Sequence, residues 1–164
     1  MRRKSFFLFL FTLIISGFVS ISFSQQMNAK LQRLAKGADI IVTGKIFKQK
    51  SNWNANKTRI YTEATIQVND YLKGNSRGNT VTVVYPGGEV GGIGELYTHM
   101  PRFKNDEDVL VFLKKEKNGN SYKVYDGENG KIRIIKNSKT GEEVTSSNIR
   151  ISYLKTQIKS YLKK

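Results

Sequence analysis

The sequence has no cysteine, and this absence excludes several kinds of protein at once. Without thiols there is no disulfide framework, no thiolate zinc site and no cysteine nucleophile. The chain also has a single histidine, His99, so a cluster of histidines around a transition metal cannot form. Proline is scarce as well, with two residues among 164. We therefore expect a fold that its hydrophobic core holds together, with no metal and no cofactor.

Acidic residues are few relative to basic ones. The chain carries 28 Lys and Arg against 13 Asp and Glu, which gives a formal net charge of +15. Hydrophobic residues make up 38% of the chain and aromatic residues 11%, proportions that are typical of a folded domain. The length corresponds to about one domain. A basic surface of this size favours anionic partners such as acidic glycans or lipid headgroups.

The first 24 residues have the three-part pattern of a signal peptide. A basic start at residues 2–4 precedes an apolar run over residues 6–19, and small residues follow at alternate positions. The apolar run is shorter than the roughly 20 residues that a membrane-spanning helix needs. Cleavage after Ser24 fits the pattern best, and cleavage after Ser22 fits nearly as well. We predict an exported protein, periplasmic or secreted, whose residues 25–164 form one domain without a transmembrane segment.

The rest of the chain is predicted to be rich in strands. Residues 60–70 alternate strictly between apolar and polar side chains, as a half-buried antiparallel strand does. Gly44, in the middle of another strand, indicates a bulge or a sharp bend. A polar loop is expected over residues 48–59. Further strands are expected over residues 39–47, 80–85, 96–100, 109–113, 122–125 and 131–135, with the last two joined as a hairpin through residues 126–130.

Helices are expected at both ends of this domain. Residues 26–36 form the first, and Gly37 ends it. The second covers residues 147–164, with Ser147 as the N-cap and an apolar stripe through Ile151, Leu154 and Ile158. Short, curved strands favour a small closed barrel over a flat sheet. The expected fold is mainly β, a small antiparallel barrel of OB or netrin-like type flanked by an N-terminal and a C-terminal helix.

Two sequence motifs carry a family resemblance. The segment Ala38-Asp-Ile-Ile-Val-Thr-Gly-Lys45 and the segment Pro86-Gly-Gly-Glu-Val-Gly-Gly92 resemble a group of exported bacterial proteins of unsettled function, and the match covers residues 38–135. The order of elements is also similar to the netrin-like domain of tissue inhibitors of metalloproteinases, an OB-type barrel. The resemblance implies a barrel and an exported location. Those inhibitors bind the protease metal through an N-terminal cysteine, which this chain lacks, so no inhibitory site is implied.

The glycine-rich segment over residues 86–94 contains five glycines in nine residues. It lacks the Gly-Lys-Ser/Thr of a phosphate-binding loop, and no helix pattern follows it, so nucleotide binding is not expected. Two interpretations remain: a long turn whose backbone needs positive φ angles, or a loop that contacts a partner. In the second interpretation Glu89 and Val90 form the loop tip. The expected partner contacts are Gly87, Gly88, Glu89, Val90, Gly91 and Gly92.

Basic residues gather in two stretches of the sequence. Lys114, Lys115 and Lys117 form one group. The larger group surrounds the only tryptophan and forms a candidate basic patch, which consists of Lys48, Lys50, Trp53, Lys57 and Arg59. OB barrels often bind single strands with aromatic and basic side chains, but an exported protein rarely meets nucleic acid, so nucleic acid is not an expected partner.

Three functions stay open at this point. The favoured one is a monomeric binding or interaction module without catalytic activity, whose partner is an unknown protein or an acidic polymer of the cell envelope. The second is a hydrolytic enzyme that uses Glu89 and His99 as acid and base. The third is a binder of acidic glycans or other polyanions. Acidic clusters at residues 106–108 and 126–128 lack the spacing of a calcium loop, so no metal site is expected.

Overall fold

The computed structural model describes residues 25–76, 78–117 and 121–163. The predicted signal peptide, residues 1–24, lies outside them. Residues Leu34–Lys164 form one compact unit, and the chain up to Arg33 belongs to another. A helix covers residues 25–37. The further elements are β1 (Ile40–Trp53), β2 (Ile60–Lys73), β3 (Thr80–Pro86), β4 (Gly88–Val90), β5 (Ile93–Glu95), β6 (Asp108–Lys115), β7 (Tyr122–Val124), the 3-10 helix η1 (Gly127–Gly130), β8 (Lys131–Lys136), β9 (Glu143–Val144) and α2 (Ile151–Leu162).

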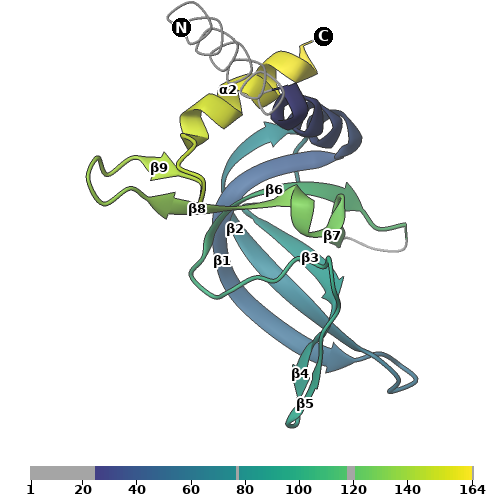
Figure 1. Cartoon of the computed structure of the whole chain (residues 1–164). Coiled ribbons are helices and arrows are strands. Elements are labelled where there is room, and N and C mark those ends of the chain that lie inside the picture. Colours follow the sequence, from purple (N-terminus) through teal and green to yellow (C-terminus); the bar gives the residue numbers. More distant parts are fainter. Residues whose placement is uncertain (1–24, 77, 118–120, 164) are drawn as a thin grey trace, which may run out of the picture. The chain divides into compact units, whose positions relative to one another are not determined.

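Five strands close into a small barrel (Figure 1). Around the ring the order is β1-β2-β3-β7-β6, and β6 pairs again with β1. The β3–β7 pairing, Val83 with Tyr122, is parallel, while the other four pairings of the ring are antiparallel. An odd number of strands cannot close a ring with antiparallel pairs alone, so one parallel pair is required. This arrangement confirms the prediction of a mainly β fold with a small OB-type barrel flanked by helices.

The barrel interior is filled mostly by β-branched and aliphatic side chains. The alternation predicted for residues 60–70 is clear over residues 60–67, because Ile60, Thr62, Ala64 and Ile66 are buried and the residues that alternate with them are more exposed. Burying this apolar surface supplies the main favourable free energy of folding. The core cluster includes Ile40, Val42, Ile46, Ala64, Ile66, Val81, Val83, Val109, Val111 and Leu113.

Strand β1 is longer than its sequence predicted, since it covers Ile40–Trp53 and the prediction ended at residue 47. Its register against β2 shifts between Thr43 and Gly44 and again after Ile46, which confirms the expected bend. A Cβ atom on Gly44 would lie 2.3 Å from the Gln67 carbonyl oxygen, so only glycine allows this approach. The predicted polar loop over residues 48–59 is wrong in its first half, since the ladder with β2 continues to the pair Trp53–Ile60.

The predicted hairpin between residues 122–125 and 131–135 is also wrong. β7 and β8 both pair with β6, along different parts of it: Leu113–Lys115 meets β7, and Asp108–Val111 meets β8. Asp126 and Gly127 adopt left-handed φ angles of 64° and 57°, and η1 then turns the chain along β6. A strand predicted at residues 96–100 is not formed, and the strand nearest to it is β5.

The two helices agree with the predicted positions to within a few residues. The first helix covers residues 25–37, and its last carbonyls, at Ala35 and Lys36, accept hydrogen bonds from the Lys73 ammonium. The second helix, α2, begins at Ile151 rather than at Ser147, because the backbone of residues 145–149 forms a turn around the Thr145 hydroxyl. Its predicted apolar stripe is buried: Ile151, Leu154 and Ile158. No helix in the described part of the chain is long and apolar enough to cross a membrane.

Candidate functional site

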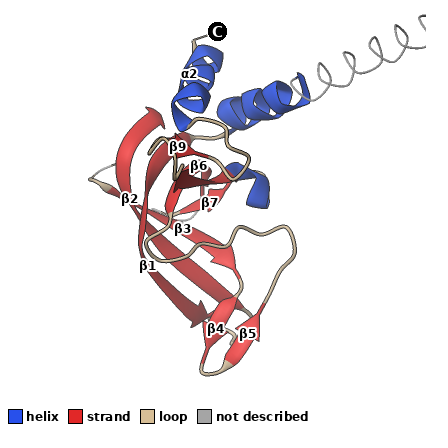
Figure 2. Cartoon of the chain, turned by 60° about the vertical axis from the view of Figure 1, so that its left-hand side comes forward, coloured by secondary structure: helices blue, strands red, loops and turns tan. Residues whose placement is uncertain are grey.

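Strands β4 and β5 form a small hairpin attached to the far end of the β1–β2 hairpin (Figure 2). The Gly87 N–H donates to the Ile60 carbonyl at 2.8 Å, and the Thr62 hydroxyl donates to the Gly87 carbonyl at 2.6 Å. The Ile60 N–H in turn donates to the Glu95 carboxylate at 3.0 Å. We call this part of the molecule, residues 51–62 and 86–97, the distal lobe.

The glycine-rich segment is therefore a hairpin and not a long loop. Gly91 and Gly92, with φ angles of 60° and 80°, form the two-residue turn between Val90 and Ile93. Gly88 lies against the barrel, where a Cβ atom would be 2.3 Å from the Thr62 Oγ1 atom. The expectation that Glu89 and Val90 form the tip is wrong, because both belong to β4.

A groove of about 820 Å³ lies beside strands β3, β6 and β7. Tyr61 and Val84 alternate along their strands with core residues, so their side chains face away from the barrel interior. Met100 and Tyr61 are the exposed apolar residues along the groove. The charged residues that line it are Lys114, Lys115, Glu116, Lys117 and Lys123. The groove thus combines an apolar wall with an excess of positive charge.

The four groove lysines differ in how far their charge is neutralised. Lys114 donates to the Asp39 carboxylate at 2.9 Å, and this bond, with one from the Lys115 N–H, lowers the pKa of Asp39. Lys123 lies 3.4 Å from the Glu116 carboxylate. No ion pair within the described residues involves the ammonium of Lys115 or Lys117. These two exposed cations are available to a ligand.

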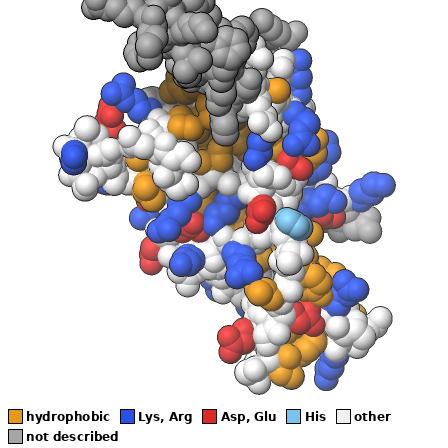
Figure 3. Space-filling model, in the orientation of Figure 1, with side chains coloured by type: hydrophobic (Ala, Val, Ile, Leu, Met, Phe, Trp, Pro, Cys, Tyr) orange, Lys and Arg blue, Asp and Glu red, His pale blue; other side chains and the backbone are white. Residues whose placement is uncertain are grey.

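A second hollow, of about 500 Å³, adjoins the groove. It lies between the β4–β5 hairpin and residues 100–103, and it shares four lining residues with the groove: Tyr85, Pro86, Met100 and Pro101. Leu96 and Tyr97 also line it. Figure 3 shows hydrophobic side chains gathered over the same lower part of the molecule, with charged side chains at the margins of the patch.

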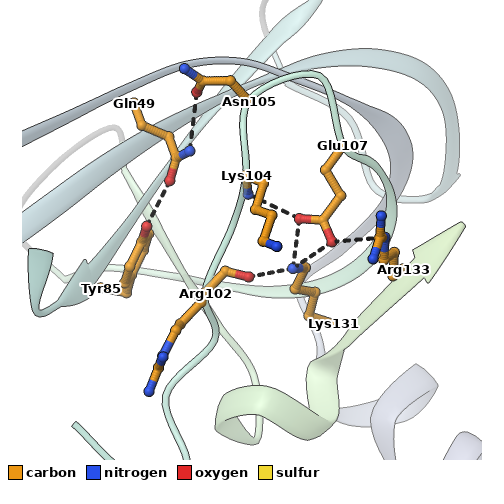
Figure 4. A network of polar contacts seen from close by, with 8 residues as sticks. All are labelled: Gln49, Tyr85, Arg102, Lys104, Asn105, Glu107, Lys131 and Arg133. Carbon is orange, nitrogen blue, oxygen red and sulfur yellow. Dashed lines mark hydrogen bonds and ion pairs between the residues drawn. The ribbon is translucent and has the colours of Figure 1, made fainter. Parts of the chain in front are cut away.

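A polar clamp fixes the segment that forms one wall of both hollows (Figure 4). The Lys131 ammonium lies 2.7 Å from the Glu107 carboxylate and also donates to the Arg102 carbonyl. The Lys104 N–H donates to the same carboxylate at 3.0 Å. Both side chains of the ion pair are nearly buried, and burial lowers the pKa of Lys131.

The Gln49 amide extends this clamp to the barrel wall. It lies 2.8 Å from the Tyr85 hydroxyl and 3.0 Å from the Asn105 side chain. Phe103 then packs against Tyr85, with ring centroids 5.5 Å apart, as part of the hydrophobic core. The loop from Pro101 to Glu107 is thereby held at one position on the barrel, so the groove has a fixed wall.

The predicted basic patch is divided between two faces of the β1–β2 hairpin. Lys48 and Lys50 pair in register with Thr65 and Glu63, while Trp53 lies on the opposite face, with Ser51. Arg59 lies 6.0 Å above the ring of Tyr97. None of the residues Lys48, Lys50, Trp53, Lys57 and Arg59 lines the groove. Of the sequence groups, the lysines at 114, 115 and 117 are the ones that the fold brings into a hollow.

The candidate catalytic pair does not share a contact in the described part of the chain. His99 is 86% exposed, and its Nδ1 atom lies 3.6 Å from the Glu128 carboxylate. Glu89 is exposed on β4, opposite Gly94. No three acidic or histidine side chains among the described residues are grouped as metal ligands would be.

Comparisons with known proteins add no family to this description. No protein-family model matches the chain, and no curated protein is similar to it. The functional argument therefore depends on the geometry of the groove and of the distal lobe. Sequence reasoning missed Lys123 and Met100 as groove residues. The alternating pattern of residues 122–124 could have predicted that Lys123 faces outward. No such pattern could have predicted the position of Met100, because Met100 lies outside helices and strands.

Proposed function

We propose that this protein is an exported binding module without catalytic activity, and that its groove holds an extended anionic ligand. The observation that carries the proposal is that Lys115 and Lys117, whose ammonium groups form no ion pair within the described residues, line the same groove as the exposed ring of Tyr61. OB-type barrels commonly bind oligomers on the face of their second and third strands and on the loop between the last two. Here β2 and β3 are the second and third strands, and Glu116, Lys117 and Ser121, which line the groove, lie in sequence between β6 and β7.

The ligand class that suits this groove is an acidic glycan or a similar polyanion of the cell envelope. Carboxylate or sulfate groups complement the lysines, and the flat ring of Tyr61 offers an apolar contact to a sugar ring. The leader pattern and the resemblance of residues 38–135 to exported bacterial proteins support an extracytoplasmic location. In that location acidic glycans are available and nucleic acid is rarely met.

Binding to heparin, a sulfated polysaccharide, tests the proposal. The variant Lys115→Ala/Lys117→Ala/Lys123→Ala should bind at least about tenfold more weakly, a loss of about 1.4 kcal/mol. The matched control removes the same charge from three exposed lysines outside the groove, as Lys136→Ala/Lys139→Ala/Lys159→Ala. It should lose much less, because exposed charges beyond a Debye length of about 8 Å at 0.15 M salt are screened.

A neutral substitution separates a specific groove from a general attraction of charge. Tyr61→Ala removes the ring and changes no charge, so it should weaken heparin binding, whereas Tyr153→Ala on α2 should not. Equal losses in the two lysine variants, together with unchanged binding of Tyr61→Ala, would mean that only the net charge attracts the polymer. That result would refute the groove as the binding site.

A further inference from the structure

The second hollow continues the groove but differs from it in charge. The two share four lining residues, so one ligand can occupy both. Four lysines and one glutamate line the groove, whereas the charged residues that line the hollow are Glu89, Glu95 and Arg102. A polyanion that continued from the groove into the hollow would meet these two carboxylates. The hollow therefore suits an uncharged part of a ligand whose anionic part lies in the groove.

The lining of the hollow is largely apolar. Pro101 and Phe103 contribute buried side chains, while Met100 and Leu96 remain 39% and 72% exposed. Large apolar side chains that are exposed at a concave place mark a binding site more clearly than single exposed residues do. The volume of about 500 Å³ falls within the range of roughly 300–1,000 Å³ that is usual for small-molecule pockets. An alkyl or acyl chain is the uncharged group that such a lining accepts.

The walls of the hollow are fixed by contacts within the chain. A Cβ atom on Gly87 would lie 2.9 Å from the Glu95 carbonyl oxygen and 3.5 Å from the Tyr97 ring, so glycine allows these residues to approach. The Tyr97 hydroxyl donates to the Glu95 carboxylate at 2.9 Å, and the Ile60 N–H donates to the same carboxylate at 3.0 Å. The polar clamp holds the opposite wall, residues 101–103. Binding therefore requires little ordering of the protein, which favours affinity.

We propose that the ligand of the groove is an anionic amphiphile, an acidic sugar that carries an alkyl or acyl chain. This inference rests on the proposed function, because the acidic sugar occupies the groove with Lys115 and Lys117. The chain enters the second hollow and contacts Leu96 and Met100. An acidic sugar without a chain leaves the apolar lining uncovered, and a neutral amphiphile leaves the lysines without a counter-charge. Only a ligand with both parts complements both hollows.

Titration calorimetry with the protein isolated from the cell envelope tests this proposal. The main probe is dodecyl glucuronide, which has an acidic sugar and an alkyl chain. Methyl glucuronide lacks the long chain, and dodecyl maltoside lacks the charge. Each probe is used below its critical micelle concentration, so that single molecules bind. Dodecyl glucuronide should bind at least about tenfold more tightly than either of the others, because it alone gains both the apolar contact and the ionic one.

Two variants assign the contacts to the two hollows. Leu96→Ser should weaken the binding of dodecyl glucuronide at least about fivefold and leave the binding of heparin unchanged, since Leu96 does not line the groove. Lys115→Ala/Lys117→Ala should weaken dodecyl glucuronide but not dodecyl maltoside. The matched control, Phe47→Ser, removes an apolar side chain that is 68% exposed and lines neither hollow, so it should bind every probe as the unaltered protein does.

Equal melting temperatures of Leu96→Ser and Phe47→Ser establish that both variants are folded. If heparin binding depends on the groove lysines but dodecyl glucuronide binds no more tightly than methyl glucuronide, the inference is overturned and the proposed function stands. If neither heparin nor dodecyl glucuronide depends on those lysines, the proposed function fails and the inference fails with it. Dodecyl maltoside that binds as tightly as dodecyl glucuronide would overturn the inference, because the hollow would then accept any alkyl chain. Self-association that Leu96→Ser abolishes would assign the hollow to a second copy of the chain and overturn it as well.

Discussion

At the scale of single residues, the ion pair of Glu107 and Lys131 holds the segment that forms one wall of the groove. The side chains are 5% and 13% exposed, so removing one partner leaves a charge in a poorly hydrated place. We predict that Lys131→Met lowers the free energy of unfolding by about 3 kcal/mol. Urea denaturation at neutral pH measures this change.

Arg133 provides the control for this prediction. Its guanidinium lies 3.7 Å from the same carboxylate but is mostly exposed, so Arg133→Ala should cost under about 1 kcal/mol. The double variant Glu107→Gln/Lys131→Met should lose less than the two single variants added together, because the partners interact directly. A Lys131→Met variant as stable as Arg133→Ala would show that the clamp does not stabilise the fold.

At the scale of elements, the β4–β5 hairpin gives different surroundings to Gly88 and Gly91, two glycines that look equivalent in the sequence. Gly88 has a φ of 131° and no room for a methyl group, so Gly88→Ala should destabilise the protein by more than about 2 kcal/mol. Gly91 has a φ of 60° and open space around it, so Gly91→Ala should cost only the backbone strain, about 1 kcal/mol. Thermal unfolding of the two variants compares them.

This comparison also tests the arrangement of the hairpin. If the segment were a free loop, neither glycine would have a neighbour, and both alanine variants would lose the same small amount. A larger loss for Gly91→Ala than for Gly88→Ala would contradict the described register of β4 with β5 and its contact with Thr62.

The strands show where prediction from local pattern fails. Residues 48–53 continue β1 because backbone hydrogen bonds pair them with β2. Their side chains are mostly polar because this part of the strand does not cover the core. The hydropathy pattern of a sequence indicates which residues are buried, so a strand that extends beyond the core shows little hydrophobic periodicity. Strands β4 and β5 were missed for another reason, since each has three residues and is too short to show an alternating pattern.

At the scale of the whole molecule, the remaining prediction concerns export. The leader pattern predicts that the protein in the cell envelope begins at Gln25, with cleavage after Ser22 as the alternative. Intact-mass measurement of the protein from that fraction decides between them. A mass that includes Met1 through Ser24 would contradict cleavage, and recovery from the cytoplasm alone would contradict export.

Some properties of this protein follow from the sequence alone. The alternation of residues 60–70, the apolar stripe of α2 and the bend at Gly44 were all predicted, because each depends on side chains that are close together in the chain. The net positive charge likewise needs no fold to be known. Periodicity is a local property and composition is an additive one, so both can be read from the sequence without the tertiary structure.

Other properties were decided only by the tertiary structure. Turn chemistry in the sequence pairs β7 with β8, yet both strands pair with β6, β7 along Leu113–Lys115 and β8 along Asp108–Val111. It groups Lys48 with Trp53 by proximity, yet the strand places them on opposite faces. The groove assembles Tyr61, Met100 and Lys117 from separate segments. Such groupings depend on contacts between residues distant in the chain, which only the tertiary structure brings together.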